Sequence, residues 1–115
     1  INTTDDPADS LEWHKKLAAE ETAFKVYPAW RPDKALNIDA PTYADYIKTL
    51  GATENTEIKT FADLKAVLVK RADLFDSLGC KASDHAFTYV PFRKADEAEI
   101  DSIIPHLLLL VTSQA

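Results

Sequence analysis

The sequence has one cysteine, two glycines and no methionine among its 115 residues. One cysteine excludes an internal disulfide framework and favours a reducing compartment such as the cytoplasm. The two glycines, Gly51 and Gly79, are too few for a glycine-rich phosphate-binding loop. The longest apolar run, residues 107–111, is far too short to span a membrane.

Positive charge is also scarce, because 13 Lys and Arg stand against 19 Asp and Glu, for a net charge of −6. Proteins that bind nucleic acid or anionic membranes usually carry a basic patch, so neither partner is expected. The first ten residues are polar and acidic, which excludes a secretory signal there. Since the chain opens on Ile1 and lacks methionine, it is expected to be processed or to be a piece of a longer protein.

The composition, 46% hydrophobic and 28% charged, is that of a globular chain with at most one domain. Apolar residues at helical spacing predict four helices, over residues 7–19, 41–50, 60–78 and 97–104. Short β-favouring segments at residues 1–4, 24–30 and 80–87 predict three strands.

Caps and breakers set the predicted helix boundaries. Asp6 before Pro7 starts the first helix, and Gly51 stops the second. The third helix opens on a capping box of Thr60 and Asp63, and Gly79 stops it. Asp96 caps the start of the last helix, and Pro105 is expected to end or kink it.

Alternation of strands and helices predicts an α/β fold with a parallel sheet. Three strands are too few for a complete barrel or doubly wound domain. The chain is therefore expected to be one partial domain over residues 1–115, a helix-rich part of a larger α/β fold.

Polar residues follow each predicted strand, which is where ligands bind in parallel α/β folds. These clusters are residues 3–6, residues 30–34 and residues 83–85. Simpler roles remain open for each: Asp6 as a helix cap, Arg31 with Asp33 as a local salt bridge, and the last cluster as an exposed turn. His14 has no second ligand at metal spacing and is interpreted as a surface or packing residue, and Trp13 as a packing aromatic.

Three strings make the sequence similar to a known family: Thr3-Thr4-Asp5-Asp6-Pro7, Trp30-Arg31-Pro32-Asp33-Lys34, and Gly79-Cys80-Lys81-Ala82-Ser83-Asp84-His85. With these strings and their spacing, the chain resembles the central part of the uronate (glucuronate) isomerases of the amidohydrolase superfamily. The resemblance extends from residue 1 to about residue 104, and residues 105–115 match poorly.

The resemblance implies a (β/α)₈ TIM-type barrel, of which this chain would supply about strands three to five with their helices. It also implies interconversion of D-glucuronate with D-fructuronate and of D-galacturonate with D-tagaturonate. The zinc or other divalent metal of the family would be held by a His-x-His pair and an aspartate outside this chain, so the chain itself is expected to hold none.

An aldose–ketose isomerisation needs a base, an oxyanion stabiliser and anchors for hydroxyls and a carboxylate. The resulting assignment makes Asp84 the candidate catalytic residue. The candidate substrate-binding residues of the hexuronate site are Arg31, Trp30, Lys34, His85 and Asp5. The unpaired edges of so few strands favour association, and a homo-oligomer is expected. Two alternatives remain: a metal-dependent hydrolase of the same superfamily, and a non-catalytic helix-rich association module.

Overall fold

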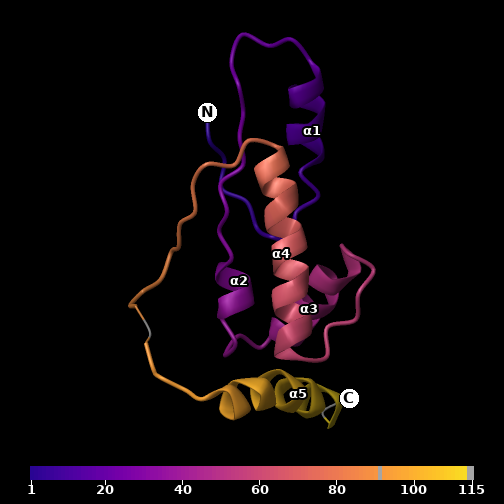
Figure 1. Ribbon diagram of the computed structural model, residues 1–115, viewed down its shortest axis with the longest axis vertical. Helices are drawn as coiled ribbons and strands as arrows, with labels where there is room; N and C mark the ends of the chain where they lie inside the picture. The colour runs from indigo at the N-terminus through magenta and orange to yellow at the C-terminus, as the bar shows by residue number, and fades with distance from the viewer. Residues whose placement is uncertain (91, 114–115) are drawn as a thin grey trace.

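The computed structural model describes residues 1–90 and 92–113, and these residues form a helix-rich structure (Figure 1). The helices in chain order are α1 (Glu12–Ala19), α2 (Asp33–Leu36), α3 (Tyr43–Ala52), α4 (Phe61–Ser77) and α5 (Glu97–Ser113). None of the helices in this described part is long and apolar enough to cross a membrane.

Three extended segments lie side by side in parallel, with residues 27–31 in the middle. Their contacts are the isolated bridges Asn2–Tyr27, Asp5–Trp30 and Trp30–Ser83. The three predicted parallel segments are therefore present, but only as bridges. Within residues 1–90 and 92–113 no regular strand forms and no barrel closes.

Pro28 explains why pairing on one side of the middle segment is so short. The backbone N–H groups of Tyr27 and Ala29 donate to residues 1 and 3, at 2.9 and 3.0 Å. The intervening positions face the other neighbour, where Trp30 N–H donates to Ala82 O at 2.9 Å. Because Pro28 has no N–H, the ladder on that side begins only at Trp30.

Helix α4 confirms the predicted capping box and stop. Thr60 Oγ1 accepts from Asp63 N–H at 3.1 Å, and Asp63 Oδ2 accepts from Thr60 N–H at 3.1 Å. At the other end Gly79 has a φ of 91°, and Cys80 N–H donates to Phe75 O at 3.1 Å. A left-handed glycine with such a backward bond satisfies the last carbonyls of a helix.

We expect Thr60→Ala to lower the free energy of unfolding by about 1 kcal/mol in urea titrations, because the N–H of Asp63 loses its acceptor. Thr42→Ala is the matched control, since Thr42 is the N-cap of α3 but its side chain makes no capping hydrogen bond. Equal losses in the two variants would contradict this role for the box.

The capping box also makes the stability of the fold depend on pH. The N–H groups of Lys59 and Thr60 donate to the carboxylate and lower the pKa of Asp63. A lowered folded-state pKa stabilises the fold above the unfolded value of about 4, and this contribution is lost as pH falls through the folded value. The stability difference between wild type and Asp63→Ala should therefore shrink on acidification.

The first helix begins later than predicted, at Glu12 and not at residue 7. Asp6 does accept hydrogen bonds, but from Ala8 N–H at 2.8 Å, which closes a turn instead of capping a helix. Leu11 then takes a left-handed conformation with φ 55°. The prediction that Trp13 packs inside is also wrong, because it is 64% exposed, with the Lys16 ammonium 4.4 Å from its ring centre.

Gly51 lies inside α3 and does not stop it. A Cβ at this position would lie 2.3 Å from Thr56 O, so glycine allows the α3–α4 connection to pass close to the helix. Helix α2, of four residues, was not predicted. It is held by Tyr43, whose hydroxyl donates to Ala35 O at 2.8 Å and whose pKa burial raises to about 12.

Helix α5 runs through Pro105, so the predicted end at residue 104 is wrong. Its cap is as predicted, because Asp96 Oδ1 accepts from Glu99 N–H at 2.8 Å. Ile104 is buried and Leu107 and Leu108 pack against the same cluster. We attribute the continuation to this apolar burial, which offsets the hydrogen bond that proline removes.

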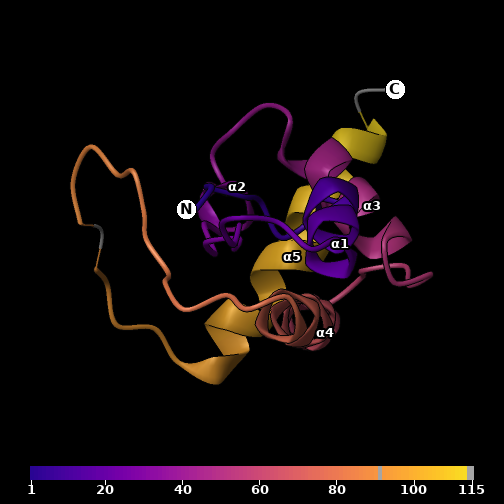
Figure 2. The ribbon, with the colours of Figure 1, turned by 90° about the horizontal axis from the view of Figure 1, so that it is seen from above.

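The core lies where α5 crosses the ends of α3 and α4 (Figure 1). Its buried members are Tyr43, Ile47, Leu50, Ile58, Leu64, Val67 and Ile104. Residues 87–90 and 92–96, between α4 and α5, lie away from this core (Figure 2). The accessible surface of 8099 Å² accordingly exceeds the roughly 6,300 Å² of a compact monomer of this mass.

Candidate functional site at the ends of the parallel segments

The three predicted polar clusters meet at one edge of the parallel segments. Arg31 N–H donates to Asp5 O at 3.0 Å, and Asp84 N–H donates to Trp30 O at 3.0 Å. The backbone thus places the three segment ends in one row, with the 30–31 end in the middle. Parallel pairing produces this arrangement, because all carboxyl ends then lie on the same side.

Arg31 forms a two-pronged ion pair with Asp84, which lies 53 positions away in the sequence. Its Nε donates to Oδ1 at 3.0 Å and its Nη2 to Oδ2 at 2.6 Å. These hydrogen bonds lower the pKa of the Asp84 carboxyl and raise the pKa of Arg31. The local pair of Arg31 with Asp33 does not form. One edge of the guanidinium is occupied by Asp84, while Nη1 lies on the opposite edge.

Asp33 instead pairs with His85, which brings a second contact between the same two segment ends. Its Oδ1 lies 2.9 Å from His85 Nδ1, and its Oδ2 accepts from Ala86 N–H at 2.8 Å. Burial alone would raise the pKa of Asp33, but the hydrogen bonds from Ala86 and His85 outweigh it and lower that pKa. Asp33 is therefore a carboxylate at neutral pH.

Trp30 and Lys34 flank these pairs in different ways. The Trp30 ring packs edge-on against Phe75 of α4, with centroids 4.9 Å apart, and is half-buried. Lys34 is exposed on α2 and, with Asp33, lines a groove between α2 and residues 86–90. Lys34 is therefore open to solvent beside Asp33, whereas the Trp30 side chain is used largely for packing.

Asp5 faces α1. Thr3 Oγ1 donates to Asp5 Oδ2 and lies 2.7 Å from His14 Nε2, and the same imidazole nitrogen is 3.7 Å from Asp5 Oδ2. His14 is buried, as the packing interpretation expects. Its role in holding this carboxylate was not predicted from the sequence, because Asp5 and His14 are joined by a turn and not by a regular helical or strand spacing.

The described residues do not fit a metal centre by themselves. No three His, Cys, Asp or Glu side chains gather within residues 1–90 and 92–113. The carboxylates of Asp84 and Asp33 are already taken by Arg31, His85 and Ala86.

The parallel segments are joined by helices, and paired charges lie at their carboxyl ends. This is the arrangement of a ligand site in a protein of the α/β class. The chain belongs to the glucuronate isomerase family, whose family model matches residues 1–112. This match confirms the resemblance inferred from the three strings and extends into the last residues, which were expected to match poorly.

Two solved structures are similar to the chain. The uronate isomerase of Thermotoga maritima is 30% identical, with a TM-score of 0.88 over 94% of this chain and 24% of that one. The glucuronate isomerase of Caulobacter crescentus is 18% identical and shares the fold, with a TM-score of 0.84 over 95% of this chain and 23% of that one. The chain thus spans about a quarter of the length of each.

Proposed function

We propose that this chain is the central barrel segment of a uronate isomerase that interconverts D-glucuronate with D-fructuronate and D-galacturonate with D-tagaturonate. The family match over residues 1–112 supports the reaction class. The observation that carries the site is the Arg31–Asp84 pair at the end of adjoining parallel segments, because it presents an oriented guanidinium where barrel enzymes bind substrate.

In this proposal Arg31 binds the uronate carboxylate. Asp84 occupies the Nε edge, so the guanidinium is held in one orientation and the Nη1 side is directed at the substrate. Since the net charge of −6 does not attract an anionic sugar, attraction must be local to Arg31 and Lys34. Asp84 orients Arg31 and accepts hydrogen bonds from substrate hydroxyls. The remaining substrate-binding candidates are Trp30, His85 and Asp5.

The zinc or other divalent metal of such an enzyme polarises substrate oxygens when bound. Residues outside this segment would hold it. We further propose a cytoplasmic homo-oligomer with a hexuronate substrate and no nucleic-acid or membrane partner, since the chain has one cysteine and is acidic.

The test compares the full-length isomerase carrying this segment with the 115-residue chain alone. We expect the full-length protein to convert glucuronate to fructuronate, and the chain alone to show neither turnover nor one tightly bound zinc per chain by metal analysis. A full-length protein inactive on both uronates would overturn the function. Zinc binding or turnover by the chain alone would overturn the proposal that residues outside this segment hold the metal.

A further inference from the structure

The register of the parallel segments determines which side chains face the helices. Asp5 is paired with Trp30, and paired residues of neighbouring parallel segments point to the same face. The Trp30 ring packs on Phe75 of α4, so this is the face that the helices cover. Side chains alternate along an extended segment, so Arg31, the next residue, belongs to the opposite face. Asp5 therefore shares the segment ends with Arg31 but not the face of Arg31.

On the helix-covered face, Asp5 belongs to a buried polar cluster with Thr3 and His14. The His14 and Asp5 side chains are only 10% and 13% exposed. The Thr3 hydroxyl has one proton, which it donates to Asp5 Oδ2. Its second contact, of 2.7 Å to His14 Nε2, therefore uses a proton of the imidazole. Two hydrogen bonds in series thus connect α1 to the Asp5 carboxylate.

The backbone of Asp5 is bonded to the segment that carries Arg31. Asp5 N–H donates to Ala29 O at 3.0 Å, and Arg31 N–H donates to Asp5 O at 3.0 Å. Within residues 1–90 the second of these is the last backbone hydrogen bond between the two segments. A displacement of Asp5 toward or away from α1 therefore moves the acceptor that holds the Arg31 backbone.

We propose that His14 is a positioning residue of the uronate site. Through Thr3 it fixes the place of Asp5, and the Asp5 backbone in turn fixes the place of Arg31, which binds the substrate carboxylate. This inference rests on the proposed isomerase function. It gives Asp5 a positioning role on the helix side in place of direct contact with the substrate.

The way in which α1 is attached favours positioning over stability alone. Within α1, which lies wholly in the described range 1–90, His14 is the one buried residue. Leu11 stands at the N-cap and supplies no capping hydrogen bond, so the first turn is held through His14. Burial of a polar group costs free energy unless it is hydrogen-bonded, whereas an apolar anchor would have no such cost. Hydrogen bonds are directional, so this attachment fixes a position as well as a contact.

The test measures KM and kcat for glucuronate in the full-length isomerase. His14→Leu keeps an apolar side chain in the site but removes Nε2–H. It should raise KM at least about tenfold, because displacing a binding group by about 1 Å can cost up to about a hundredfold. The value of kcat should stay within about threefold, since the loss is one of binding.

Two further variants act on the same chain of hydrogen bonds. Thr3→Val replaces the hydroxyl by a methyl group of similar size, and it should raise KM as His14→Leu does. His14→Gln keeps an N–H donor at the end of the side chain, so KM should return to within about threefold of wild type. This rescue distinguishes a lost hydrogen bond from a general loss of packing.

The matched control for stability is Thr60→Ala, which removes the cap of α4 but leaves the segment ends intact. It should lower Tm without changing KM. A double-mutant cycle then tests the route through Arg31. In the Arg31→Lys background, His14→Leu should raise KM by no more than about twofold, because residues that act through one another are not additive.

Each contrary result has its own meaning. If His14→Leu and Thr3→Val lower Tm but leave KM unchanged, as Thr60→Ala does, the cluster is structural only and the positioning role is wrong, while the isomerase function stands. A full rise in KM on top of Arg31→Lys would overturn the route through Arg31. If His14→Leu does not fold, Thr3→Val decides by the same measurements. If wild type turns over neither uronate, the proposed function itself fails.

Discussion

Replacing Arg31 by lysine is expected to lower kcat/KM for glucuronate at least about tenfold in the full-length isomerase, or about 1.4 kcal/mol of transition-state stabilisation. In the proposed site the guanidinium holds Asp84 with its Nε and Nη2 atoms and also offers donors to the uronate carboxylate. A lysine ammonium is a single point charge and cannot serve two carboxylates in fixed directions. Steady-state kinetics on glucuronate measure the loss.

The melting temperature separates this role from a structural one. The Arg31 and Asp84 side chains are 35% and 48% exposed, so their pair contributes little to stability, and Tm should hardly change. Arg93→Lys is the control, because Arg93 also pairs with a carboxylate, that of Glu99 on α5, but its side chain is 82% exposed. Near-normal kinetics with a lowered Tm in Arg31→Lys would refute the substrate-binding role.

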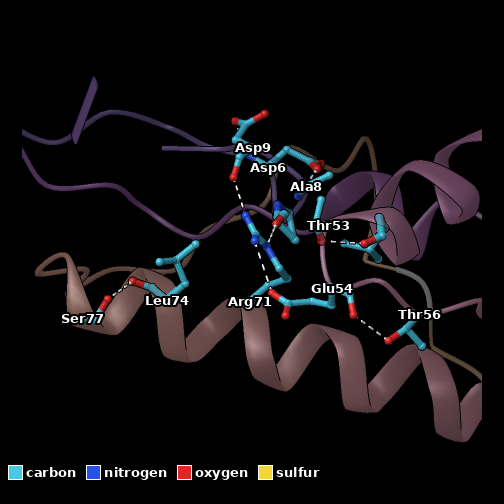
Figure 3. A network of polar contacts seen from close by, with 11 residues as sticks. Asp6, Ala8, Asp9, Thr53, Glu54, Thr56, Arg71, Leu74 and Ser77 are labelled. Atoms are coloured by element: carbon cyan, nitrogen blue, oxygen red, sulfur yellow. Dashed lines mark hydrogen bonds and ion pairs between the residues drawn. The ribbon is translucent and has the colours of Figure 1, made fainter. Parts of the chain in front are cut away.

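Replacing Arg71 by methionine is expected to lower the free energy of unfolding by about 3–5 kcal/mol. Arg71 lies on α4 with its side chain only 7% exposed. Its Nε donates to Pro7 O at 2.7 Å, its Nη2 donates to Asp9 O, and its Nη1 reaches Glu54 Oε1 at 3.3 Å (Figure 3). Methionine fills similar space but leaves these acceptors without a donor.

Urea unfolding measures the loss, and the exposed Arg93→Met is the matched control, for which a change of at most about 1 kcal/mol is expected. Arg71→Lys should recover only part of the stability, because one ammonium cannot reach acceptors on separate segments. If Arg71→Met were no more damaging than Arg93→Met, the network in Figure 3 would not be stabilising.

Local signals predicted α4 in detail. Thr60 and Asp63 are three residues apart, and Gly79 follows the last apolar position, so cap and stop depend only on neighbouring residues. The same local rules misplaced the start of α1 and the end of α5. There Asp6 and Pro7 are held by Tyr46 and Arg71, and Pro105 is followed by apolar residues that pack on the core.

The sequence by itself determined the family, the three segment ends and the polar residues at them, because short strings and strand-end positions are local features. Only the tertiary structure decided the partners. Arg31 pairs with Asp84 and not with nearby Asp33, and Asp33 pairs with His85, 52 positions away. The physical reason is the parallel pairing of Trp30 with residues 82–84, which sets two distant segment ends side by side and thereby determines which charges meet.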